Sequence, residues 1–238
     1  MQAYHNDPQI KQFYIDRMKA HMASDTLIQG GDYGYWDEEA QRGCGIGCIL
    51  HTNTTPPYAT PHEAFKTELG IPSDFAHFVD CLFEDLPRPT HKTFPLHFLE
   101  SITVGADLSL VIPQFMVWLL TDPIEGVLQY TQAAEIQTTI EQAAALYQRV
   151  LQGKGRLSEE WKQVQMVIPS LMERSDDAEW SALHSAWYGI RGTPWYALED
   201  ARDAARPDTT WSAEIQETHN KRTLRQAEKF LSLLRETH

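Results

Sequence analysis

Residues 132–151 read QAAEIQTTIEQAAALYQRVL and give the clearest helical signal in the sequence. Apolar side chains recur here at the spacing of one face of an α-helix: Ile136, Ile140, Ala143, Tyr147 and Val150. Glycines at positions 153 and 155 end the pattern, because glycine is common just beyond a helix end. The stretch therefore predicts an amphipathic helix that buries this stripe in a core.

Signals for helix starts and ends recur on both sides of this segment. Residues 60–63, TPHE, combine a capping box with proline at the first helical position. Ser73 can cap the next helix, and residues 193–194, TP, open another one far downstream. The pattern predicts a mainly α protein, a single globular domain of about ten helices.

The stretch 26–52 departs from this helical pattern. It is rich in glycine, which serves turns and close backbone approach: Gly30, Gly31, Gly34, Gly43, Gly45 and Gly47. Short extended pieces at Tyr33–Trp36 and Ile46–His51 can pair there as a hairpin. We expect a small irregular or β-hairpin element near residues 26–52.

The glycines between residues 153 and 155 also mark the best candidate boundary within the chain. Nothing in that segment is typical of a long flexible linker, so we expect a joint between subdomains that pack together. The prediction is an N-terminal helical subdomain, residues 1–153, which carries the glycine-rich loop. A C-terminal helical subdomain, residues 154–238, would pack on it.

Charge narrows the classes of partner. The chain has 33 acidic and 20 basic residues, which gives a formal net charge of −13. Such a surface repels phosphates, so direct binding of nucleic acid is disfavoured. Acidity of this kind either keeps a protein soluble or presents carboxylates to a basic partner. We expect a protein partner and leave the oligomeric state open.

Three features bear on the compartment. Cys44, Cys48 and Cys81 are an odd and low number of cysteines, which argues against a disulfide scaffold. The N-terminal residues lack the basic and apolar stretches of a signal peptide. The longest apolar stretch, Leu108–Leu120, is too short to span a bilayer. We therefore expect a cytoplasmic protein without a membrane segment.

Residues 42–51, RGCGIGCILH, hold the main candidate site. Cys44, Cys48 and His51 form a C-x3-C-x2-H pattern, and His62 follows eleven residues later. Thiolates and imidazoles are the preferred ligands of tetrahedral zinc. The first hypothesis is therefore a zinc site made by Cys44, Cys48, His51 and His62.

The same segment allows two other interpretations. Cys44 or Cys48 could be the nucleophile of a thiol hydrolase, with His51, His62 or His21 as its base. Alternatively, both cysteines are small buried residues in a tight turn, since free cysteine is among the most buried residue types.

His21 and Asp25 lie four residues apart near the end of the first predicted helix and share its apolar face. An inward His–Asp pair could orient a catalytic imidazole or support a metal site. It could equally be a buried hydrogen-bonded pair that ties the helix end to the glycine-rich loop. Glu68, Asp80 and Glu84 are further carboxylates that would reach this loop if their helices pack around it.

Four strings of the sequence carry a resemblance to known proteins: GCGIGCILH (43–51), TELGIP (67–72), LFEDLP (82–87) and GADLSLV (105–111). They resemble an uncharacterised family of bacterial and phage-associated proteins with GCxxGC…H, LGIP and GADLS motifs. The similarity covers residues 15–150 and the closing helix. It implies a prokaryotic or phage origin and a role in host–phage conflict. The family has no established activity, so it implies no catalytic residues.

Two function classes follow from the sequence. The first is a non-catalytic, acidic, helical interaction protein with a zinc site. The second is a cysteine- or zinc-dependent hydrolase that uses the loop of Cys44, Cys48 and His51. No P-loop, Rossmann fingerprint, H-E-x-x-H or G-x-S-x-G motif is present to favour a particular chemistry.

Overall fold

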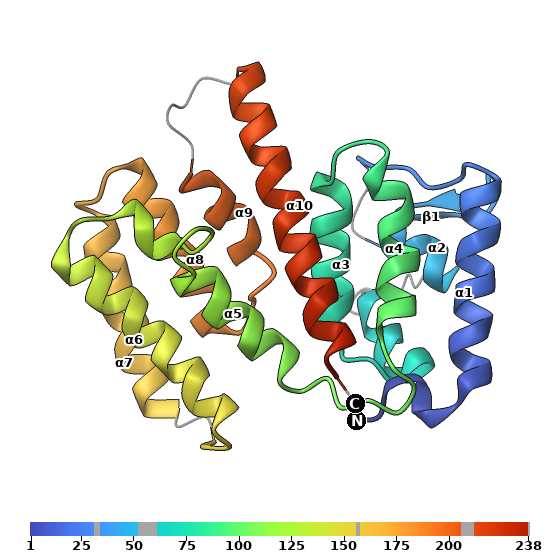
Figure 1. Ribbon diagram of the computed structural model, residues 1–238, viewed down its shortest axis with the longest axis horizontal. Helices are drawn as coiled ribbons and strands as arrows, with labels where there is room; N and C mark the ends of the chain where they lie inside the picture. The colour runs from blue at the N-terminus through green and yellow to red at the C-terminus, as the bar shows by residue number, and fades with distance from the viewer. Residues whose placement is uncertain (31–33, 52–60, 156–157, 206–211, 238) are drawn as a thin grey trace. The chain divides into compact units, whose positions relative to one another are not determined.

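The computed structural model describes residues 1–30, 34–51, 61–155, 158–205 and 212–237. Within these ranges the chain is mainly α-helical, with ten α-helices and one two-stranded antiparallel hairpin (Figure 1). The expected fold class and the expected hairpin near residues 26–52 are confirmed. The contacts divide the chain into two compact units, one formed by Met1–Ser109 with Ala227–His238 and the other by Leu110–Gln226.

The first unit holds the helices that surround the glycine-rich loop. Its regular elements are α1 (Pro8–Ala23), β1 (Trp36–Asp37), β2 (Arg42–Gly43), α2 (Gly45–Leu50), α3 (Ser73–Asp85), α4 (Thr90–Ser101) and the end of α10 (Ala213–Arg235). Short helical turns join them at Ala3–Asn6, Pro61–Glu63 and Phe65–Leu69. Asp7 caps α1 by accepting a hydrogen bond from Gln9 N at 2.8 Å, and Pro8 follows at the first helical position.

Aromatic packing explains why the last helix contributes to this unit. The Phe230 ring of α10 lies against three phenylalanines, with centroids 5.8 Å from Phe75, 5.2 Å from Phe78 and 6.1 Å from Phe98. All four side chains are buried. Fully burying one such side chain contributes about 2 kcal/mol, so this cluster links α3, α4 and the end of α10 in a single core.

One expectation for the glycine-rich loop is wrong. Residues 46–51 were expected to be extended, but Ile46 to Leu50 lie in α2, while β1 pairs with β2 in the register Trp36–Gly43 and Asp37–Arg42. Cys44 has an extended backbone, and its sulfur accepts a hydrogen bond from Gly47 N at 3.4 Å, so it caps the helix. The sequence of a short apolar run does not distinguish a buried helix from a buried strand. Here the Cys44 side chain caps the run as a helix.

Glycine is required where α2 meets the backbone before β1. A Cβ atom on Gly47 would lie 1.8 Å from the carbonyl oxygen of Tyr35, and one on Gly43 would lie 2.3 Å from the same oxygen. Cys44 N donates a hydrogen bond to that oxygen at 3.0 Å. The close approach fixes the position of Cys44 next to the hairpin.

The second unit is a set of packed helices. It contains α5 (Val111–Thr121), a turn at Val127–Tyr130, α6 (Ala134–Leu151), α7 (Ser158–Met172), α8 (Asp177–Arg191), α9 (Ala197–Asp203) and the first part of α10. The predicted stripe of α6 is buried at Ile136, Ile140, Ala143 and Tyr147, whereas Val150 is only half-buried. The long amphipathic helix is therefore confirmed.

The expected division between residues 153 and 154 does not coincide with the boundary of the two units. Helices α6 and α7, on either side of it, lie in the same unit and pack together. Tyr147 meets Trp161 edge-on with centroids 5.0 Å apart, and Arg149 pairs with Glu160 at 2.5 Å. The glycines at 153 and 155 thus lie between two helices that pack together in one unit, and such a position carries the same local sequence signal as a domain boundary.

None of the helices in the described ranges has the length and apolarity needed to cross a membrane.

Candidate metal centre

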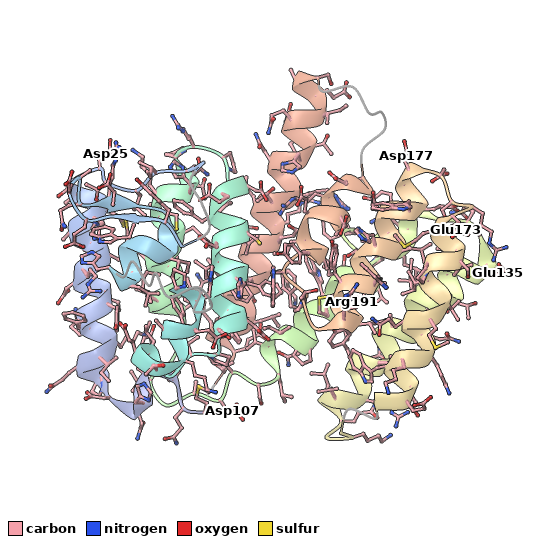
Figure 2. The ribbon with its side chains drawn as sticks, turned by 180° about the vertical axis from the view of Figure 1, so that it is seen from behind. Asp25, Asp107, Glu135, Glu173, Asp177 and Arg191 are labelled. Atoms are coloured by element: carbon pink, nitrogen blue, oxygen red, sulfur yellow. The ribbon has the colours of Figure 1, made fainter. Side chains whose placement is uncertain are left out.

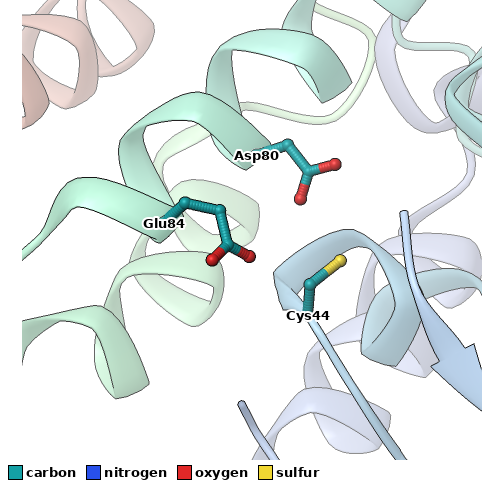
Figure 3. Close-up of side chains that lie close together, drawn as sticks. All are labelled: Cys44, Asp80 and Glu84. Atoms are coloured by element: carbon teal, nitrogen blue, oxygen red, sulfur yellow. The ribbon is translucent and has the colours of Figure 1, made fainter. Parts of the chain in front are cut away.

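Three potential metal ligands meet between the glycine-rich loop and α3. Cys44 comes from the start of α2, while Asp80 and Glu84 lie one turn apart on the same face of α3. The sulfur of Cys44 and one oxygen of each carboxylate all lie within 4.8 Å of one another. Figure 3 shows both carboxylates projecting from α3 toward Cys44. The site is therefore built by two elements that are distant in sequence.

One oxygen of each carboxylate is held by the surrounding protein. Oδ2 of Asp80 accepts hydrogen bonds from Gly34 N at 2.7 Å and from His62 Nε2 at 2.8 Å. Oε2 of Glu84 accepts one from Gly30 N at 2.6 Å. Two glycine amides of the loop thus orient the two carboxylates, which are outer contacts of the kind that position metal ligands.

The second oxygen of each carboxylate has no hydrogen-bond partner. Oδ1 of Asp80 and Oε1 of Glu84 are buried and have no hydrogen-bond partner in the described part of the chain, while the neutral Cys44 thiol hydrogen-bonds to the Asp80 carboxylate. Leaving such an atom unsatisfied costs about 1–3 kcal/mol, and more when it is charged. These two oxygens therefore need either a proton or a cation.

The protonation of this cluster depends on burial. Burial raises the pKa of Glu84 to about 7, and the negative charge of Asp80 adds to the shift, while the amide of Gly30 opposes it. Burial, reinforced by the charge of Asp80 and by the hydrogen bond of the thiol to that carboxylate, holds the pKa of the Cys44 thiol far above its usual range, while the amide of Gly47 opposes the shift. Without a cation, Cys44 is a neutral thiol at pH 7 and Glu84 is close to its midpoint.

His62 belongs to this site, but behind Asp80. Its ring is 2% exposed, and the Nε2 atom donates to Asp80. The His77 ring stacks on it with centroids 3.9 Å apart and an angle of 10° between the planes. Burial lowers the pKa of His77 to about 4, and the neighbouring His62 adds to that effect. His62, a predicted ligand, thus positions a carboxylate that the zinc hypothesis did not include.

Cys48 and His51 lie in a different environment. The Cys48 thiol donates to the carbonyl oxygen of Gly43 at 3.4 Å, and burial raises the pKa of this thiol to about 12. His51 ends α2 in the left-handed conformation, with φ of 53°. Its Nε2 atom faces Nε2 of His21, and its ring stacks on Trp36 at 4.1 Å. Of the four predicted zinc ligands, Cys44 and His62 both contact Asp80, whereas Cys48 and His51 each have other partners.

The predicted pair of His21 and Asp25 is not formed. Nδ1 of His21 lies 2.7 Å from Thr26 Oγ1, and its Nε2 faces His51. The Asp25 side chain is 71% exposed and pairs with Lys92 instead. The reason is local: α1 ends at Ala23, and Asp25 takes a left-handed conformation with φ of 55°, which turns it off the helix face.

Both thiols lack the properties of an activated nucleophile. Reactive cysteines have a lowered pKa and an accessible sulfur, next to a cation or a base. The pKa values of Cys44 and Cys48 are raised, both side chains are fully buried, and carboxylates, Asp80 and Glu84, lie beside the sulfur of Cys44. This geometry argues against the thiol-hydrolase hypothesis.

Sequence reasoning named Asp80 and Glu84 only as conditional candidates, together with Glu68. Glu68 instead accepts a hydrogen bond from the hydroxyl of Tyr14 at 2.6 Å. The signal available in the sequence was the position of Asp80 among the apolar residues of the run FVDCLF, residues 78–83. In the structure every side chain of this run is buried. A carboxylate within a fully buried helix segment requires a specific partner.

The chain matches no family model, and no curated protein or solved structure is significantly similar to it.

Proposed function

We propose that this protein binds one divalent metal ion, with zinc as the best fit, through Cys44, Asp80 and Glu84. The observation that carries the proposal is the pair of buried carboxylate oxygens, Oδ1 of Asp80 and Oε1 of Glu84, which lack partners beside the sulfur of Cys44. A dication satisfies both oxygens at once and offsets the negative charge of the three deprotonated ligands.

The donor set favours zinc over the common alternatives. Magnesium and calcium select oxygen ligands, so a thiolate among three donors is unfavourable for them. Zinc accepts sulfur and carboxylate oxygen together, at about 2.3 Å and 2.0–2.2 Å. The atoms within 4.8 Å of one another can reach these distances with small rotations of the side chains.

The role that fits best is structural. The ligands link the start of α2 to α3, and the glycine-rich loop is held to the same carboxylates through Gly30 and Gly34. Cys44 and Asp80 have no exposed surface. Three protein ligands leave the fourth position of zinc to a water molecule, and a hydrolytic zinc needs that position open to a substrate. Burial closes the site here, so the bound ion would contribute to folding free energy instead. Metal binding at this site would therefore stabilise the first unit.

The test measures metal content and thermal unfolding of the full chain. Protein stripped with chelator is reconstituted with zinc, and we expect one equivalent bound and a higher Tm. Cobalt is the spectroscopic probe, since a sulfur-to-cobalt charge-transfer band reports the thiolate ligand. Cys44→Ser should abolish that band.

Cys48→Ser is the matched control, because Cys48 is an equally buried free thiol outside the cluster. It should keep the band and the zinc. Binding of less than about a tenth of an equivalent of zinc by the folded wild-type protein would end the proposal. A cobalt band that is lost in Cys48→Ser and kept in Cys44→Ser would assign the sulfur ligand to the wrong cysteine.

A further inference from the structure

The second unit carries a surface cluster of aromatic rings on α8 and on the turn before α9. We refer to it as the aromatic face. Its members are Trp180, His184, Trp187, Tyr188, Trp195 and Tyr196. The residues at 180, 184, 187 and 188 follow helical spacing, so they share one side of α8.

The rings form a continuous chain of contacts. His184 lies 4.3 Å from Trp180, 5.3 Å from Trp187 and 4.4 Å from Tyr188, centroid to centroid. Tyr188 is 5.1 Å from Tyr196. His184 is held in place by its Nδ1 atom, which lies 3.1 Å from Asp200 on α9. The face is thus fixed in shape by its own contacts.

Part of this surface is open to solvent. Trp180 is 40% exposed and Tyr196 is 42% exposed, and Trp187 and Tyr188 are half-buried. Contiguous exposed aromatic surface of this kind often marks an interaction site, since tryptophan and tyrosine carry much of the energy of protein interfaces. The buried parts of the rings keep them ordered.

Charge around the aromatic face indicates the kind of partner. Exposed carboxylates lie just after α7, at the start of α8 and on α9: Glu173, Asp176, Asp177 and Glu199. The one exposed cation of α8 and α9 is Arg191, whose guanidinium lies over the Trp187 ring, 4.2 Å from its centroid. Figure 2 labels Asp177 and Arg191, the first and last residues of α8. Arg191 shows within the protein that these rings accept a guanidinium on their faces.

We propose that the aromatic face binds an arginine-bearing segment of a protein partner. Guanidinium groups would lie over the open faces of Trp180 and Tyr196, and the flanking carboxylates would pair with further cations. Single-stranded nucleic acid also stacks on aromatic rings, but it requires a basic groove along its backbone. The excess of carboxylates here opposes that ligand. The proposal concerns the second unit and does not depend on the metal centre.

The experiment measures binding of defined peptides to the full chain by calorimetry. The probes are a glycine–serine peptide with several arginines, the same peptide with lysines, and the same peptide with citrullines, which keep the planar shape but lose the charge. We expect affinity to fall in the order arginine, lysine, citrulline. A single-stranded oligonucleotide is the fourth probe and should not bind.

The test variant is Trp180→Ala combined with Tyr196→Ala, because these two rings are the most exposed members of the aromatic face. It should bind the arginine peptide about fivefold or more weakly, as expected for the loss of cation–π contacts. The control is Phe13→Ala, which removes a 54% exposed aromatic ring from the first unit and should bind as wild type. Circular dichroism confirms that each variant is folded.

Three outcomes would overturn the proposal. The first is unchanged affinity in the double variant, which would show attraction by charge alone. The second is equal affinity for the arginine and citrulline peptides, which would show stacking without a cation. The third is competition by the oligonucleotide for the arginine peptide, which would assign the face to nucleic acid.

Discussion

His62 and Asp80 form a buried hydrogen bond in which Nε2 of the imidazole lies 2.8 Å from Oδ2 of the carboxylate. The bond has a directional consequence, because it occupies one oxygen of Asp80 and leaves Oδ1 without a partner beside Cys44 and Glu84. His62, which the spacing pattern suggested as a metal ligand, therefore orients the proposed ligand Asp80. The metal centre can be tested both at its ligands and at this positioning residue.

The contribution of His62 is testable by comparing two substitutions. His62→Gln keeps a side-chain N–H that can donate to Asp80, whereas His62→Leu removes it. Loss of an outer contact to a ligand typically lowers metal affinity about 10- to 100-fold. We expect that loss in His62→Leu and a smaller one in His62→Gln, measured by competition with a zinc chelator. Equal affinity in the wild type and His62→Leu would exclude a positioning role.

Zinc binding should release protons, with a dependence on pH that follows from Glu84. In the metal-free protein, burial raises the pKa of Glu84 to about 7 and holds the pKa of Cys44 higher still. Both must be deprotonated to bind, so affinity should rise as pH increases from 6 to 8. Calorimetry in buffers of different ionisation enthalpy counts the released protons.

Glu84→Gln provides the control for that measurement. It has no proton to lose at position 84, so both its proton release and its pH dependence should be smaller. Identical proton release in Glu84→Gln and the wild type would show that Glu84 is not a ligand.

Acid should destabilise the protein partly through His51. Burial lowers the pKa of His51 to about 4, and the charges of Arg17 and His21 add to the shift, whereas an unfolded histidine titrates near 6.5. Between these values the unfolded state binds more protons, so the free energy of unfolding falls as pH decreases from 6.5 to 4. NMR titration of the ring protons should give a midpoint near 4.

His51→Asn tests how much of the acid sensitivity comes from His51, because asparagine does not titrate and tolerates the positive φ of 53° at this position. The variant should lose less stability than the wild type over the same pH window, as measured by urea unfolding. An equal loss in both proteins would assign the acid sensitivity to other groups, such as His77.

The close approach at α2 predicts a large difference between two glycine substitutions. In Gly47→Ala the new Cβ would lie 1.8 Å from the Tyr35 carbonyl oxygen, so the backbone must shift, at a cost of about 2–4 kcal/mol in the free energy of unfolding. Gly155→Ala meets no atom within 4 Å and should change stability by less than about 1 kcal/mol. Chemical denaturation of both variants tests the prediction, and similar stabilities would contradict it.

Periodicity predicted the helices because their buried faces repeat at helical spacing. The stripe through Ile136, Ile140 and Tyr147 needed no tertiary information, and α6 lies where it was expected. Residues 46–50 were misassigned because a six-residue helix is too short for a period. Its formation depends on a sulfur cap and on glycines that fit against Tyr35, and neither is visible in an apolar run.

The candidate site was predictable only in part. The segment around Cys44 was identified by its glycines and thiols, and His62, proposed as a ligand, lies instead against Asp80. Asp80 and Glu84 come from a helix whose distance from the loop depends on tertiary packing, so sequence spacing could not place them. Asp25 was misplaced because one left-handed residue after the helix end reverses the direction of a side chain.

The chain path of α10 has a practical meaning for dissecting the protein. The first unit receives the Phe230 ring from a segment more than a hundred residues beyond Ser109. A fragment that stops at Ser109 would expose the rings of Phe75, Phe78 and Phe98 to water and would be prone to aggregate. Separate expression of this half requires that residues 227–237 be supplied as a peptide or joined to the N-terminus by circular permutation.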